Sequence, residues 1–180
     1  MPGDTQVGTA PLTLFRDGSF HADTWSFAEE GAALPASGDV AVGKTRFLAE
    51  VQTLRARNGG IGVVLTPGED LDGIAGHLDR ITLVVLRFTK YSDGRPYSVA
   101  RLLRDRHGYT GELRATGDVL RDQVIYMRRA GFDALDVAHA GTREVLRTGS
   151  IVGVHHHYQP ASNEAHEAHT PIAPWRRLSY

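Results

Sequence analysis

The chain has 180 residues, of which 41% are hydrophobic and 23% are charged, as in an ordinary globular protein with a single buried core. Its 20 basic and 21 acidic side chains nearly cancel, so no global charge attracts nucleic acid or an anionic membrane. No apolar run approaches the roughly 18 residues that a membrane-spanning helix needs. The chain contains no cysteine, which excludes disulfides, thiol nucleophiles and metal sites held by thiolates.

Residues 1–43 show no sustained periodicity, and we expect them to form an irregular arm that covers part of the core. Within the arm, two short apolar segments flank the dipeptide Asp17-Gly18, which is typical of a tight hairpin turn. The N-terminus has no basic segment followed by an apolar one. We therefore expect no signal peptide and a cytoplasmic protein.

Residues 44–150 alternate between helical and strand patterns, which predicts an α/β domain with a small, mainly parallel, half-barrel-like sheet. Helices are expected at 44–57, 71–78, 97–107, 119–130 and 142–148, and strands at 61–65, 81–88, 112–115 and 132–137. The strand ITLVVLRF at 81–88 is almost wholly apolar, which indicates burial on both faces. A sheet of about four strands keeps two open edges that the arm or a second subunit could cover, so we also expect a homodimer.

Residues 151–180 hold five of the nine histidines and are expected to form an extended, His-rich tail. Three consecutive histidines at 155–157 would point to alternate faces of a strand and could not all reach one ion. The segment HEAH at 166–169 does not match the zinc-binding pattern H-E-x-x-H. The sequence therefore predicts no metal site.

The first candidate site is the loop KYSDGRPYS at 90–98, which follows the strongest predicted strand. In parallel α/β sheets, ligands collect beyond the carboxyl ends of the strands. A helix start favours an anion, and an arginine can hold an oxyanion through two hydrogen bonds. The alternative interpretation is an ordinary Ser-Asp-Gly turn with Pro96 at the first helical position. The candidate anion-binding residues of this loop are Lys90, Ser92, Asp93 and Arg95.

The second candidate site is the segment RATGDVLRDQ at 114–123, again between a predicted strand and a helix. Asp118 is expected to cap that helix, but it could also act with Lys90 as the acid/base pair of an enzyme. Arg114 and Arg121 would then read the charge of the ligand. We expect Lys90, Arg95 and Asp118 to gather in one positively biased pocket. No glycine-rich nucleotide motif is present, so the sequence leaves the cofactor unidentified.

The region 95–129 is rich in arginine and could dock an acidic partner or RNA. The chain shows no aromatic platform on which bases would stack, which argues against nucleic acid.

Several motifs together resemble those of a bacterial family known as domain of unknown function 934. The central block is YSVARLLRDRHGYTGELRATGDVLRDQVIYMRRAGFDALDV at 97–137, preceded by FTKYSDGR at 88–95 and LPASGDVAV at 34–42. Trp25, RFLAE at 46–50, YQPA at 158–161 and PWRR at 174–177 agree as well, so the resemblance covers nearly the whole chain. One departure is Pro96, where the family is expected to favour glycine.

The resemblance implies a role in sulfur assimilation, because members of the family are typically encoded beside assimilatory sulfite reductase and are often labelled as oxidoreductases of sulfite reduction. A chain without cysteine cannot hold the thiolate-ligated centre of that reductase. We therefore expect an accessory protein that binds sulfite reductase, another sulfate-assimilation enzyme or a small oxyanion substrate. The alternative is a small oxidoreductase that uses a nicotinamide or flavin cofactor in the same pathway.

Overall fold

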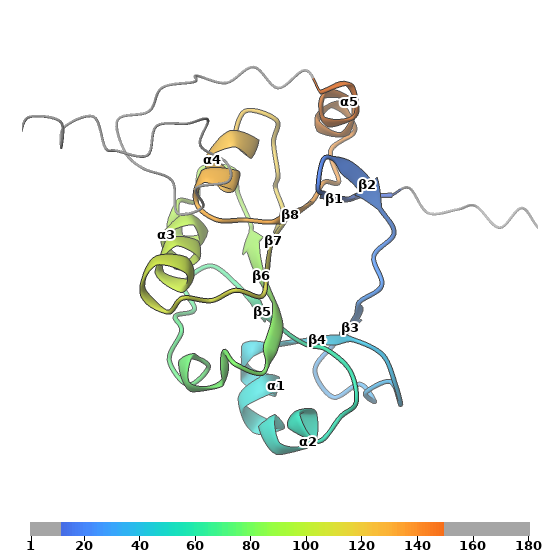
Figure 1. Cartoon of the computed structure of the whole chain (residues 1–180), viewed down its shortest axis with the longest axis vertical. Coiled ribbons are helices and arrows are strands. Elements are labelled where there is room, and N and C mark those ends of the chain that lie inside the picture. The colour runs from blue at the N-terminus through green and yellow to red at the C-terminus, as the bar shows by residue number, and fades with distance from the viewer. Residues whose placement is uncertain (1–11, 150–180) are drawn as a thin grey trace, which may run out of the picture.

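The computed structural model describes residues 12–149. These residues form one curled sheet of eight strands flanked by helices (Figure 1). The strands are β1 (Leu14–Arg16), β2 (Ser19–His21), β3 (Ser26–Ala28), β4 (Val40–Gly43), β5 (Ile61–Leu65), β6 (Ile81–Phe88), β7 (Glu112–Gly117) and β8 (Ala134–Asp136). Their order is β2-β1-β8-β7-β6-β5-β4-β3. Neighbours from β3 to β8 are parallel, whereas β1 is antiparallel to both β2 and β8. This confirms the predicted α/β fold with a mainly parallel, half-barrel-like sheet.

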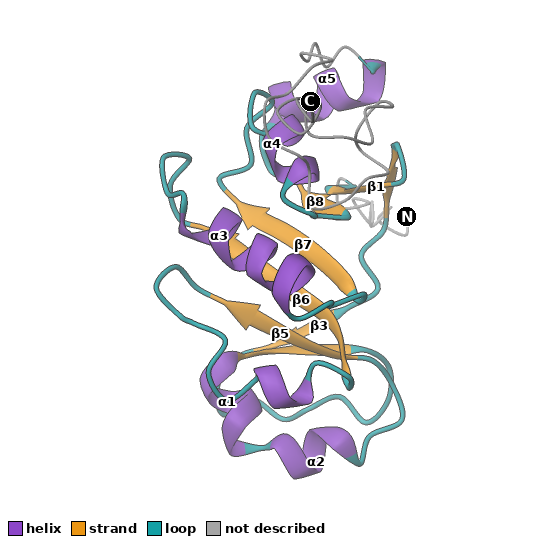
Figure 2. Cartoon of the chain, turned by 60° about the vertical axis from the view of Figure 1, so that its left-hand side comes forward, coloured by secondary structure: helices purple, strands orange, loops and turns teal. Residues whose placement is uncertain are grey.

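The helices are short, and α3 and α4 lie along one face of the central strands (Figure 2). They are α1 (Lys44–Ala49), α2 (Val51–Arg55), the 3-10 helix η1 (Ala75–His77), α3 (Arg95–Arg101), the π-helix η2 (Leu102–Arg106), α4 (Val124–Arg129) and α5 (Ala140–Thr148). The main core includes alternate residues of β6 such as Val84 and Leu86, whereas Leu83 and Val85 belong to a smaller cluster with Trp25. Strand β6 is therefore buried on both faces, as its apolar sequence predicts.

The connection between β2 and β3 forces the sheet to curl. These strands lie at opposite edges of the sheet, yet only residues 22–25 separate them. Trp25 in this connection packs where β5 has glycine. A Cβ atom added at Gly62 would lie 3.1 Å from Cζ3 of Trp25 and 2.8 Å from the Cβ of Ala41. A glycine inside a strand often marks such a close approach.

The arm contributes more to the sheet than its sequence indicates. Its predicted hairpin is confirmed, with Asp17 and Gly18 at φ values of 49° and 80° in the turn between β1 and β2. The arm also supplies β3 and β4, which extend the parallel part of the sheet. The boundary expected at residue 43 thus falls at the end of a strand of that sheet. The predicted tail at 151–180 lies outside the described residues.

Three of the predicted helices differ from the structure. The helix expected at 44–57 is interrupted at Glu50 and ends at Arg55. The helix expected at 71–78 is wrong: the segment forms turns and the short η1, with Gly73 at a φ of 80°, although Leu71 and Ile74 are buried as their spacing suggests. The helix expected at 119–130 begins only at 124.

The tight contact at Gly62 predicts that alanine there will be disruptive. We expect Gly62→Ala to lower the free energy of unfolding by about 1–3 kcal/mol, because the new methyl group must displace Trp25 or the backbone of β4. The matched control is Gly43→Ala, since a Cβ at Gly43 meets nothing within 4 Å. Chemical denaturation measures both. Equal stability of the two variants would show that Trp25 does not lie against β5.

Candidate functional site

The loops after β6 and β7 meet at the carboxyl ends of the parallel strands, where ligands bind in open α/β sheets (Figure 2). The backbone N–H of Tyr91 donates to Oδ2 of Asp118 over 2.7 Å, and the Gln123 side-chain amide donates to the carbonyl of Tyr91. The N–H of Asp118 donates to the carbonyl of Phe88 over 2.9 Å. These three hydrogen bonds fix the two loops against each other.

Asp118 does not cap a helix, which corrects the sequence prediction. The residue preceding α4 is Gln123, and residues 121–123 form a turn that separates Asp118 from the helix. The Asp118 carboxylate instead holds the backbone of the neighbouring loop. This hydrogen bond supports a structural role for Asp118 in holding the loop. A general acid or base would instead need this carboxylate oxygen to face the substrate.

Asp93 and Arg95 form a pair within the first loop. Nε of Arg95 donates to Oδ1 of Asp93 over 2.9 Å, and Nη2 donates to Oδ2 over 2.7 Å. The hydrogen bonds and charge of Arg95 hold the pKa of Asp93 below its usual value, and Asp93 in turn raises the pKa of Arg95. The pair largely neutralises itself and leaves little charge for an external anion.

Lys90, Ser92 and Arg121 are exposed at the same end of the sheet. None of the three makes a side-chain hydrogen bond or ion pair with any other residue in the range 12–149. Within the described part of the chain, the charges of Lys90 and Arg121 are therefore unpaired. Of the seven residues that the sequence singles out, the structure brings six to this end: Lys90, Ser92, Asp93, Arg95, Asp118 and Arg121.

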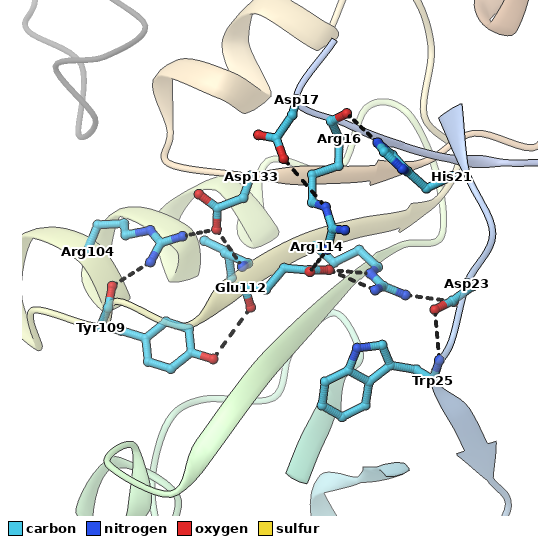
Figure 3. A network of polar contacts seen from close by, with 11 residues as sticks. Arg16, Asp17, His21, Asp23, Trp25, Arg104, Tyr109, Glu112, Arg114 and Asp133 are labelled. Atoms are coloured by element: carbon cyan, nitrogen blue, oxygen red, sulfur yellow. Dashed lines mark hydrogen bonds and ion pairs between the residues drawn. The ribbon is translucent and has the colours of Figure 1, made fainter. Parts of the chain in front are cut away.

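Arg114 lies apart from them, in the interior of the curled sheet (Figure 3). Only 1% of its side chain is exposed. Its Nη1 donates to Oδ2 of Asp23 over 2.7 Å, and its Nε donates to Oε1 of Glu112 over 2.8 Å. Nη2 lies 2.7 Å from the same Glu112 oxygen but lacks hydrogen-bond geometry. Glu112 also pairs with Arg16, so Arg114 belongs to a structural network that joins β7 to β1 and to the 22–25 connection.

Arg87 is a candidate that our sequence analysis does not single out. It is exposed near the end of β6 and makes no side-chain hydrogen bond or ion pair with another described residue. It follows the buried Leu83 and Val85 at a spacing of two residues, on the face of β6 away from the main core. The sequence could have indicated Arg87 through its charge, since it is the only charged residue in the almost wholly apolar strand ITLVVLRF.

A shallow recess of about 210 Å³, including its open mouth, lies between the ends of β5 and β6. Arg87 and Arg95 line it, together with Glu69, whose carboxylate accepts hydrogen bonds from the N–H and hydroxyl of Thr66. Because that volume includes open solvent, the enclosed space is much smaller and has no room for a dinucleotide. Residues 12–149 contain no group of three or more His, Asp or Glu side chains that could hold a metal ion.

Comparison with known proteins identifies the family. A family model described as bacterial protein of unknown function (DUF934) matches residues 62–169. The chain belongs to this family. The match includes both loops of the candidate site and all of β6 and β7. No curated protein and no solved structure matches the chain. None of the helices within residues 12–149 is long and apolar enough to cross a bilayer.

The buried position of Arg114 predicts that it stabilises the fold. We expect Arg114→Met to lower the free energy of unfolding by about 3 kcal/mol, because it leaves the Asp23 carboxylate without its cation and Glu112 with Arg16 alone. Arg121→Met is the matched control and should change stability by less than about 0.5 kcal/mol. Urea denaturation compares the two variants. Equal stability would mean that the Arg114 network does not hold the sheet.

Proposed function

We propose that this member of the DUF934 family is a cytoplasmic accessory protein of assimilatory sulfite reduction that binds a small oxyanion at the carboxyl ends of β6 and β7. The observation that carries the proposal is the Arg87 guanidinium, which is exposed at the end of β6 with no acceptor in the described part of the chain. A guanidinium can offer two parallel hydrogen bonds to an oxyanion. The pathway rests on the family resemblance given by the sequence.

Three exposed cations that lack an acidic partner among the described residues support an anion as the ligand. Arg87, Lys90 and Arg121 keep their charges available, whereas Asp118 accepts a backbone hydrogen bond and Asp93 is paired with Arg95. Asp122 is the one other exposed carboxylate in the two loops, 89–94 and 118–123. Asp118 and Glu69 also keep their negative charges, but both are half-buried and accept backbone hydrogen bonds, so the three exposed cations are accompanied by one exposed carboxylate.

The alternative, an oxidoreductase with Asp118 and Lys90 as its acid/base pair, has less support. One oxygen of Asp118 already accepts the N–H of Tyr91, and the recess is small for a nicotinamide or flavin. A cofactor absorbance, or a rise in melting temperature with NADPH, FMN or FAD, would favour the enzyme instead.

Titration with sulfite and with sulfate tests the binding proposal. We expect saturable binding by the wild-type protein and an affinity about 10- to 150-fold lower for Arg87→Gln, since a charge-assisted hydrogen bond contributes about 1.5–3 kcal/mol. Arg80→Gln is the control, because Arg80 is also an exposed arginine but lies at the opposite, amino end of β6. Calorimetry measures all three proteins. No binding by the wild type, or equal binding by Arg87→Gln, would contradict the oxyanion site.

Growth of a strain that lacks the gene tests the pathway. We expect the deletion strain to grow on sulfide or cysteine and to grow poorly on sulfate and on sulfite as sole sulfur source. The wild-type gene should restore growth. Normal growth of the deletion strain on sulfate would contradict the proposed role in sulfite reduction.

A further inference from the structure

Tyr91 presents its ring to solvent from a backbone that is held on both sides. Its N–H donates to Asp118 and its carbonyl accepts from Gln123, yet 61% of the residue is exposed. No aromatic or cation–π partner occupies the ring among residues 12–149. An aromatic side chain on a fixed backbone loses little further freedom on binding, which favours its use as an anchor.

Tyr126 lies nearby on α4 and is also 61% exposed. Tyr126 follows Gln123 by three residues, so the side chains of Gln123 and Tyr126 are close together at the start of α4. The Gln123 side chain also contacts the backbone of Tyr91. The half-buried Tyr97 lies near this helix: burial and the negative charge of Asp122 raise its pKa to about 12. The exposed rings therefore belong to one local surface, which we call the Tyr91–Tyr126 face and define by Lys90, Tyr91, Arg121, Gln123 and Tyr126.

The composition of the Tyr91–Tyr126 face suits a protein partner. Tyrosine and arginine are enriched among the residues that contribute most to protein–protein binding. The exposed cations Lys90 and Arg121 precede Tyr91 and Asp122 in the chain and have no acidic partner in the range 12–149, so this surface carries two cations and one exposed carboxylate, Asp122. Charge complementarity then requires carboxylates on the surface that meets them.

We propose that the Tyr91–Tyr126 face is a docking surface for a protein that presents an apolar patch bordered by acidic side chains. The two rings would contact the apolar patch, and Lys90 and Arg121 would meet the carboxylates at its rim. This inference rests on the proposed function for the identity of the partner used in its test.

Binding to purified sulfite reductase tests the docking surface. We expect the full chain to bind the reductase, with an affinity that falls as salt rises, since salt screens charges at the rim. Tyr91→Ala and Tyr126→Ala should each weaken binding at least tenfold, and the double variant should weaken it further. Leu48→Ala is the matched control, because Leu48 is a large apolar residue that is 41% exposed on α1. Surface plasmon resonance reports the affinities.

Three results would overturn the docking surface: no binding by the wild-type chain, equal binding by the tyrosine variants and the control, or self-association that both tyrosine substitutions abolish. The last result would assign the face to a second copy of this chain. Because neither tyrosine belongs to the proposed oxyanion site, both variants should bind sulfite like the wild type. Loss of docking with retained sulfite binding, or the reverse, therefore separates this proposal from the proposed function.

Discussion

The connection between β2 and β3 is the constraint on which the rest of the structure depends. In a flat sheet the two edge strands would lie about 34 Å apart, seven strand spacings of about 4.8 Å. Residues 22–25 can bridge at most about 18 Å between His21 and Ser26. The sheet must therefore curl until its edges approach each other, which gives it an inner and an outer face.

The buried network of Arg114 fastens this connection to the centre of the sheet. Asp23 belongs to the connection, and Arg114 and Glu112 belong to β7, so their ion pairs join an edge-to-edge link to a central strand (Figure 3). Trp25 adds packing against β5 at Gly62. With the curl fixed in this way, the carboxyl ends of β5, β6 and β7 stay together. Arg87, Lys90 and Arg121 are exposed at this end of the sheet.

The sequence predicts the central strands well because their pattern reports local burial. ITLVVLRF requires apolar surroundings on both faces and receives them from the main core and from Trp25. Strand β3 has no such pattern, since Ser26 and Phe27 remain exposed, and it forms through its pairing with β4. The segment 71–78 has helical spacing, but Gly73 adopts a φ of 80° that a helix does not allow, so burial of Leu71 and Ile74 occurs without a helix.

The candidate site is predictable in its location but not in its pairings. The rule that ligands gather at the carboxyl ends of parallel strands identifies both loops. Arg114, however, meets Asp23, which lies 91 residues earlier in the chain, and no spacing rule reports such a contact. The partners of Asp118 and Arg95 likewise depend on how the loops fold. Arg87 could have been recognised from the sequence as a candidate site residue. A charged side chain in a strand that is buried on both faces must reach solvent, and Arg87 does so near the carboxyl end of β6.

A crystal structure grown with selenate, an oxyanion whose selenium scatters anomalously, tests the central claim most directly. An anomalous peak within hydrogen-bond distance of the Arg87 guanidinium, at the carboxyl end of β6, is the result that this account predicts. A fully occupied selenate elsewhere, with Arg87 bound to another part of the chain, would contradict it.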